Sequence, residues 1–232
     1  MKILLYYAMP KELDGLIRDF ELSPGRTCSG VSFYPVSENI TAVAGGIGKV
    51  NAAMATQLAI ERCHPDLIIN IGVAGCFKNV EIGTLMLADK FIQHDVDTTG
   101  CGDPIGLVST VNTVEFPTSW PDMAKKAMDM TRLHYLTGTG ATGDWFAKSG
   151  DRAKWIDQTF HPLFIEMEGA AIAQVCMRNQ IAFMALKSVS DCLFGNDKYD
   201  FNFPKAMKNL NTVAIQFAKN IQITQVSHLV LN

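Results

Sequence analysis

The chain has 232 residues, of which 48% are apolar and 19% charged, and its formal net charge is −3. This length and composition suit one packed globular domain spanning residues 1–232 and exclude a disordered chain. Because the charge is slightly negative and no run of Lys or Arg occurs, we expect neither nucleic acid nor an anionic membrane as the main partner.

Short apolar runs alternate along the chain with segments of helical period. In chain order we expect a strand at 3–9, a helix at 10–20, strands at 31–34 and 40–44, a helix at 49–63, a strand at 67–73, short strands at 85–88 and 91–92, a loop at 98–109, a helix at 123–133, strands at 135–141 and 163–167, a helix at 168–178, a strand at 183–190 and a long helix at 204–223. This order predicts an α/β fold: a single domain with a central mixed, largely parallel twisted sheet flanked by helices.

The sequence carries no membrane or secretion signal that we recognise. The apolar start, residues 1–8, is too short for a signal sequence and lacks a small-residue cleavage site. No segment reaches the roughly 20 apolar residues of a membrane span. The six cysteines are scattered without a Cys-x-x-Cys pair, which is typical of reduced thiols rather than a disulfide frame or a zinc site. We therefore expect a cytoplasmic protein.

Carboxylates follow three of the expected strands. Glu12 follows the first strand, the pair Glu166 and Glu168 follows the strand near residue 165, and Asp191 follows the last strand. Ligands of α/β sheets bind beyond the carboxyl ends of such strands, so these acids fall where a site is expected. Each could instead cap a helix or favour its first turn. Asp191 has no helical pattern directly after it, which favours a functional role there.

The glycine-rich turn before the helix at 49–63 resembles a phosphate loop but fails both common templates. Asn51 replaces the third glycine of the dinucleotide motif, and Lys49 is not followed by Ser or Thr as in a Walker A loop. The turn either brings backbone amides to a small ligand or is a tight turn without one, and the spacing favours neither.

Other reactive groups give weaker signals. The five histidines show no ligand spacing, so we expect no metal or other cofactor, and each histidine to be a surface or hydrogen-bonded residue. No G-x-S-x-G elbow supports serine hydrolysis. Trp145 and Phe146, after a glycine-rich segment, are either core residues or a platform for a planar base.

Together these segments resemble the nucleoside phosphorylase superfamily, and most closely its bacterial 5'-methylthioadenosine/S-adenosylhomocysteine nucleosidase branch. The resemblance covers almost the whole chain. It is carried, in the family's order, by Ala8-Met9-x-x-Glu12, Gly46-Ile-Gly-Lys-Val50 with Ala52-Ala53, Pro65-Asp-Leu-Ile-Ile-Asn-Ile-Gly72-x-Ala-Gly75, His94-Asp-x-Asp97, Gly143-Asp-x-Phe146, Glu166-Met-Glu168 with Ala171-Ile-Ala173, and Ser190-Asp191.

The resemblance implies roles for individual residues. Asp191 would protonate the purine N7 with help from Ser190, Glu12 would polarise the attacking water, and Glu168 would hold the ribose hydroxyls. The other residues expected at the substrate are Ala8, Met9, Ile47, Val73, Ala74, Gly75, Trp145, Phe146, Ala147, Glu166, Met167 and Lys187. These residue types suit glycosidic cleavage, because carboxylates stabilise an oxocarbenium-like sugar. An acid whose pKa is raised by burial can protonate the leaving base.

Three residues and one segment depart from the branch. Val73 occupies a position where the branch usually has Ser, and Lys187 occupies one where it has an Arg near the water site. Trp145 replaces a residue that is typically small. Lysine keeps the charge of arginine but loses its planar two-pronged donor geometry. The segment 98–105 lacks the aromatic that the branch contributes across its dimer interface to the 5'-alkylthio pocket. Base and ribose recognition are therefore expected, while the 5'-group stays open.

The leading hypothesis is a hydrolase that releases adenine from 5'-methylthioadenosine, S-adenosylhomocysteine or both, and the resemblance implies a homodimer. One alternative is a nucleosidase for another 5'-substituted nucleoside, of the futalosine type. A second is a phosphate-dependent phosphorylase, which would need a cationic pocket where we find only Lys49 and the distant Lys187. A third is a non-catalytic nucleoside sensor, against which the three carboxylates argue.

Overall fold

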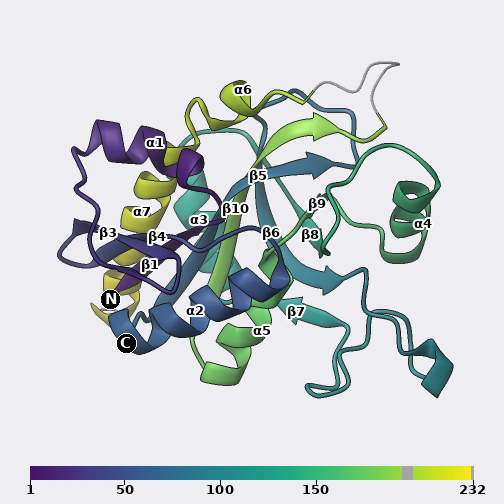
Figure 1. The fold of residues 1–232 in the computed structure, drawn as a ribbon. Helices are drawn as coiled ribbons and strands as arrows, with labels where there is room; N and C mark the ends of the chain where they lie inside the picture. Colours follow the sequence, from purple (N-terminus) through teal and green to yellow (C-terminus); the bar gives the residue numbers. More distant parts are fainter. Residues whose placement is uncertain (195–200, 231–232) are drawn as a thin grey trace.

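The structure is a computed structural model that describes residues 1–194 and 201–230. The strands are β1 (Ile3–Tyr7), β2 (Thr27–Cys28), β3 (Val31–Ser37), β4 (Ile40–Ala44), β5 (Leu67–Cys76), β6 (Leu85–Gln93), β7 (Glu115–Pro117), β8 (Tyr135–Thr142), β9 (Phe164–Glu166) and β10 (Ala182–Cys192). The helices are α1 (Pro10–Asp19), α2 (Lys49–Cys63), α3 (Pro121–Asp129), α4 (Asp151–Phe160), α5 (Gly169–Asn179), α6 (Phe203–Met207) and α7 (Leu210–Val230), with a 3₁₀ turn at Thr99–Cys101. Figure 1 shows their arrangement.

The strands form one mixed sheet whose middle part closes on itself. Strand β5 pairs in parallel with β1 and β10, and its last two residues pair with β9. Strand β10 also pairs with β6, which continues through β8 to β9. These pairings join five strands in a ring, while β1, β4, β3 and β2 extend from β5 as an open sheet. The predicted mixed, largely parallel sheet is confirmed, and the ring closure adds to it.

Helices cover both faces of the sheet, as Figure 1 shows. Along β1, Leu4 and Tyr6 belong to one buried cluster with residues of α2 and α5. Ile3, Leu5 and Tyr7 belong to a second cluster with residues of α1, α3 and α7. Because successive side chains of a strand point to opposite faces, this alternation places β1 between two helical layers. In the described part of the chain, no helix has the length and hydropathy of a bilayer span.

The structure corrects several expected elements. The two short strands expected at 85–88 and 91–92 are one strand, β6, and the single long helix expected at 204–223 is two helices, α6 and α7. Helix α4 and the short strands β2 and β7 were not expected. Asp191 lies inside β10 rather than after it. The expected helix at 49–63 agrees with α2 over its full length.

Candidate active site

A pocket of about 290 Å³ opens where the carboxyl ends of several strands meet. It is lined by Ala8, Met9 and Glu12 after β1, Ile47 after β4, Val73, Ala74 and Gly75 of β5, Trp145, Phe146 and Ala147 after β8, Glu166, Met167 and Glu168 at the end of β9, and Ser190 and Asp191 of β10. All of the predicted site residues except Lys187 are in this set. Lys11, Ile165 and Phe201 line the pocket as well and were not predicted.

Backbone amides hold the Glu12 carboxylate in place from two strand ends. Its Oε2 accepts hydrogen bonds from the amides of Ala8 (3.1 Å) and Met9 (2.9 Å), and its Oε1 accepts one from Val73 (3.3 Å). Burial raises the pKa of Glu12, while the Met9 amide and the Lys187 ammonium oppose that rise. Gly72 makes room for this carboxylate, since a Cβ there would lie 2.9 Å from Oε1. Glu12 is thus a positioned, desolvated carboxylate at the pocket.

The Glu168 carboxyl group lies at the N-terminus of α2. Its Oε1 accepts a hydrogen bond of 2.8 Å from the amide of Gly48, the residue before the helix. Burial and then the charge of Glu166 raise the pKa of Glu168 to about 8, although Lys187 and the Gly48 amide act against that rise. With a pKa in this range, the Glu168 carboxyl group keeps its proton at neutral pH. It can then both donate a hydrogen bond to a sugar hydroxyl and accept one.

A β-bulge directs the end of β10 into the pocket. Val189 pairs with Ala74 and Asp191 with Gly75, so Ser190 is the extra residue of the bulge. The Ser190 hydroxyl donates to Oδ1 of Asp191 at 2.7 Å. A Cβ at Gly75 would lie 3.1 Å from Oδ2 of Asp191, so the glycine lets this carboxylate approach β5 closely. Bulges commonly re-aim side chains at functional sites in this way.

Glu166 and Lys187 support the site from behind. Glu166 accepts hydrogen bonds from the amides of Glu168 and Gly169, and from the Thr142 hydroxyl. Its Oε2 also lies 3.1 Å from the Lys187 ammonium, with both side chains buried. Glu166 reaches the pocket wall, whereas Lys187 does not line the pocket. The protein itself therefore supplies hydrogen-bond partners to both carboxylate oxygens of Glu166.

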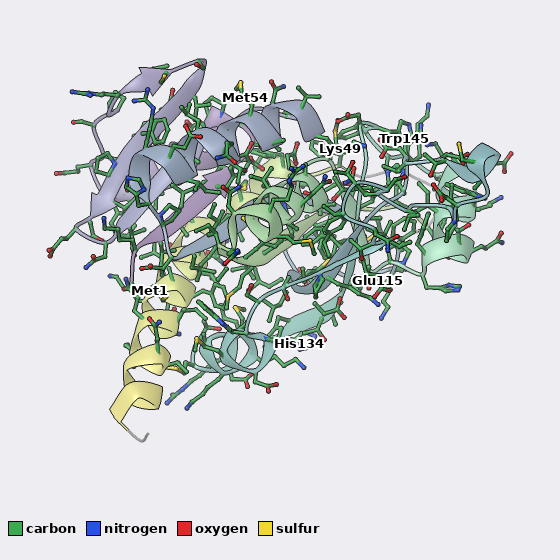
Figure 2. The ribbon with its side chains drawn as sticks, turned by 90° about the horizontal axis from the view of Figure 1, so that it is seen from below. Met1, Lys49, Met54, Glu115, His134 and Trp145 are labelled. Carbon is green, nitrogen blue, oxygen red and sulfur yellow. The ribbon has the colours of Figure 1, made fainter. Side chains whose placement is uncertain are left out.

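A polar network fixes the loop after β8 against the start of α2. Asp144 accepts a hydrogen bond of 2.8 Å from the Lys49 amide and donates its own amide to Asp95 at 2.9 Å. The Lys49 ammonium lies 2.6 Å from Asp95. Figure 2 shows Lys49 at the end of α2 that faces Trp145. The amides of Gly48 and Lys49 thus donate hydrogen bonds to Glu168 and Asp144, so these two amides are engaged by the protein itself and not open to a small ligand, which was one of the two alternatives for the turn.

Two phenylalanines face each other at the pocket. Phe146 is 61% exposed, and its ring meets that of Phe201 edge to face at a centroid distance of 5.7 Å. Trp145 lines the pocket too, with the guanidinium of Arg152 4.4 Å from its ring centroid. Flat aromatic surfaces of this kind suit a planar base. Phe201 was missed because it lies in a stretch without a periodic pattern.

His94 contradicts the expectation for the histidines. Its side chain is buried and packs beside Gly143 and Trp145, yet in the part of the chain that the structure describes neither ring nitrogen has a hydrogen-bond partner. Burial lowers the pKa of His94 to about 4, so the imidazole is neutral. Among the residues that the structure describes, no group of three or more His, Cys, Asp or Glu could hold a metal ion.

Comparisons with known proteins agree with this architecture. The model of the phosphorylase superfamily matches residues 2–220. The 5'-methylthioadenosine/S-adenosylhomocysteine nucleosidase of Shewanella loihica is 34% identical over 209 residues, which cover 87% of this chain and 91% of that protein.

Solved structures are similar over nearly the whole chain. The native futalosine hydrolase of Helicobacter pylori has a TM-score of 0.83 at 25% identity, covering 97% of this chain and 98% of that one. The 5'-methylthioadenosine/S-adenosyl homocysteine nucleosidase of Campylobacter jejuni has a TM-score of 0.82 at 28% identity, covering 95% and 98%. The fold, the pocket at the strand ends and the family match lead to one conclusion: this chain belongs to the phosphorylase superfamily, a family of purine nucleoside phosphorylases and nucleosidases.

Proposed function

We propose that the protein hydrolyses the N-glycosidic bond of a 5'-substituted adenine nucleoside and releases adenine. The observation that carries this proposal is the convergence of Glu12, Glu168 and Asp191 on one pocket from three different strand ends. Their hydrogen-bond partners differ. Glu12 accepts hydrogen bonds from three backbone amides, Glu168 accepts one from an amide at the start of a helix, and Asp191 accepts one from a serine hydroxyl. Carboxylates in different environments can divide acid, base and binding roles among themselves.

In the proposed reaction Asp191 donates a proton to N7 of the purine, oriented by Ser190, so that the base leaves neutral. Glu12 accepts a hydrogen bond from water, which attacks the anomeric carbon and forms the new C–O bond as the C–N bond breaks, and the Glu12 carboxylate takes the proton that the water loses. Glu168 binds the ribose hydroxyls, and the ring of Phe146 stacks on the base. Negative charge near the sugar stabilises the oxocarbenium-like transition state.

The charges around the pocket favour water over phosphate as the nucleophile. Among the described lining residues, Lys11 is the only cation, and it lies outside the buried interior. Lys187 is engaged with Glu166, and the amides at the start of α2 are engaged with carboxylates. A phosphate ion needs unpaired donors and positive charge. We therefore favour hydrolysis over phosphorolysis as the reaction of this protein.

The 5'-substituent has two candidates. The first is the thioether group of 5'-methylthioadenosine or S-adenosylhomocysteine, as the name of the Shewanella loihica relative states for that protein. The second is a futalosine-type group, which the similarity to the Helicobacter pylori futalosine hydrolase supports. Val73 and Trp145, which depart from the nucleosidase branch, both line the pocket and bear on this choice.

The test is release of free base. Purified protein is incubated with 5'-methylthioadenosine, S-adenosylhomocysteine, adenosine, inosine and a futalosine-type nucleoside, each with and without phosphate. We expect phosphate-independent release from at least one 5'-substituted nucleoside. Strict dependence on phosphate would overturn hydrolysis, and no release from any substrate would favour a sensor.

We also propose a homodimer. Helix α2 and the turn before it expose Ile47, Val50 and Met54, and Val50 is 80% exposed. Figure 2 shows Met54 pointing outward from α2. Val50 and Met54, four residues apart, lie on one face of α2, and together with Ile47 in the preceding turn they suit contact with a second copy. Light scattering of the protein against a Val50→Lys variant tests this: the wild type should have the mass of two chains and the variant a lower one.

A further inference from the structure

Lys11 places a positive charge at the mouth of the pocket. It lies in the first turn of α1, next to the buried Glu12, and its own side chain is exposed. Its ammonium lies 4.5 Å from the ring centroid of Phe203, two residues after the pocket-lining Phe201. This cation–π contact places the exposed ammonium beside the mouth of the pocket.

Neither the helix nor an ion pair accounts for a lysine at this position. The positive end of the helix dipole lies at the first turn, where acidic side chains are favoured and lysine is disfavoured. In the described part of the chain, no carboxylate forms an ion pair with Lys11. Within residues 1–194 and 201–230, the charge of Lys11 is therefore not neutralised by a carboxylate.

The residues in the buried part of the pocket give the Lys11 ammonium a possible role in binding an anionic group. Glu12, Glu168 and Asp191 line the interior, and the buried Lys187 is bonded to Glu166. Among the described lining residues, Lys11 is therefore the cation with which an anionic group on a ligand could pair. If Asp191 faces the base and Glu168 the ribose, the 5'-substituent is the part of the nucleoside left to extend toward Met9 and Lys11.

We propose that Lys11 is a specificity-determining residue that selects nucleosides whose 5'-substituent ends in a carboxylate. This inference rests on the proposed function for the identity of the ligand as a nucleoside. Phe201 and Met9 contact the apolar stem of the substituent, and the Lys11 ammonium pairs with the carboxylate at its end. A neutral 5'-group of the same length gains the apolar contacts alone.

Binding of two 7-deazaadenosine analogues tests the proposal independently of catalysis. One analogue carries a 5'-(3-carboxypropylthio) group and the other a 5'-butylthio group, and both lack the N7 that would be protonated for cleavage. Calorimetry gives the ratio of their Kd values for wild type, Lys11→Met, Lys11→Arg and Lys125→Met. Lys125 is an exposed lysine of α3, which lines no part of the pocket, so its variant is the matched charge control.

We expect Lys11→Met to shift the ratio against the carboxylate by roughly 3- to 10-fold, while Lys11→Arg and Lys125→Met keep it. Raised salt should shrink the wild-type preference. An unchanged ratio in Lys11→Met overturns the proposal, and failure of both analogues to bind overturns it together with the proposed function. Selective binding without adenine release from the matching adenosine derivatives would instead overturn hydrolysis and leave the role of Lys11 supported.

Discussion

The Lys187 ammonium lies 3.1 Å from Oε2 of Glu166, and the two side chains are 2% and 1% exposed. This buried ion pair joins β10 to the end of β9, directly behind the pocket. The Lys187 ammonium lowers the pKa of Glu12 and of Glu168 against the effect of burial, whereas the Glu166 carboxylate raises the pKa of Glu168. The pair therefore links the stability of the fold to the charge state of the site.

Removing one partner of this pair should destabilise the protein strongly. Lys187→Met leaves the Glu166 carboxylate buried without its cation, which costs about 3–5 kcal/mol in comparable cases. The double variant Lys187→Met with Glu166→Gln removes the uncompensated charge and should recover part of that loss. Urea denaturation of the wild type, both single variants and the double variant measures the coupling. Strictly additive losses would contradict the assigned pairing.

Asp191→Asn should abolish turnover while the fold stays intact. The amide cannot donate the proton that the leaving base requires, and general acid catalysis is worth roughly 10²- to 10⁴-fold. Ser190→Ala should lose less, since it removes only the hydroxyl that donates to Asp191 at 2.7 Å. Steady-state kinetics and circular dichroism provide the measurements. Ordinary activity in Asp191→Asn would remove the general-acid assignment.

Glu12→Gln should reduce kcat by roughly 10²- to 10⁴-fold with a smaller change in KM, because the amide oxygen can accept a hydrogen bond from the water but cannot take its proton. An amide group also cannot accept all three backbone hydrogen bonds of Glu12, so we expect a stability loss of about 1–3 kcal/mol. Asp14→Asn on the exposed side of α1 is the matched control. Equal kcat values in the two variants would exclude Glu12 from catalysis.

His94 should make the protein sensitive to acid. Burial lowers its pKa from 6.5 to about 4, so between these pH values the unfolded chain binds a proton that the folded chain does not. Folding stability attributable to His94 is therefore full above pH 6.5 and falls as the pH drops toward 4, by an amount on the order of 3 kcal/mol.

The measurement is the pH dependence of urea unfolding for wild type, His94→Leu and His134→Leu. His94→Leu should lose less stability than the wild type between pH 6.5 and 4. His134 is exposed, so its variant should follow the wild-type slope. If the free energy of unfolding of His94→Leu fell with pH as steeply as that of the wild type, His94 would have the same pKa in the folded and unfolded chains and the prediction would be wrong.

Local patterns were enough to predict much of the fold. The apolar run of β5 and the helix α2 were predicted because strand and helix periods are local, and α2 has clear ends at Gly48 and at His64, which adopts a left-handed conformation. Strand-end carboxylates and the ordered motifs predicted which residues line the pocket, and the pocket contains all of them but Lys187. Their catalytic roles remain predictions.

Other features were decided only by contacts between distant parts of the chain. The sequence alone predicted the α/β class and the strand ends at which the pocket forms. Tertiary structure decided the closed ring of strands, the bulge at Ser190, the pairing of Lys187 with Glu166 and the position of Lys11 beside Phe203. The physical reason is that periodicity reports which face of an element is buried, whereas partners far apart in sequence are chosen by packing and charge compensation in the folded core.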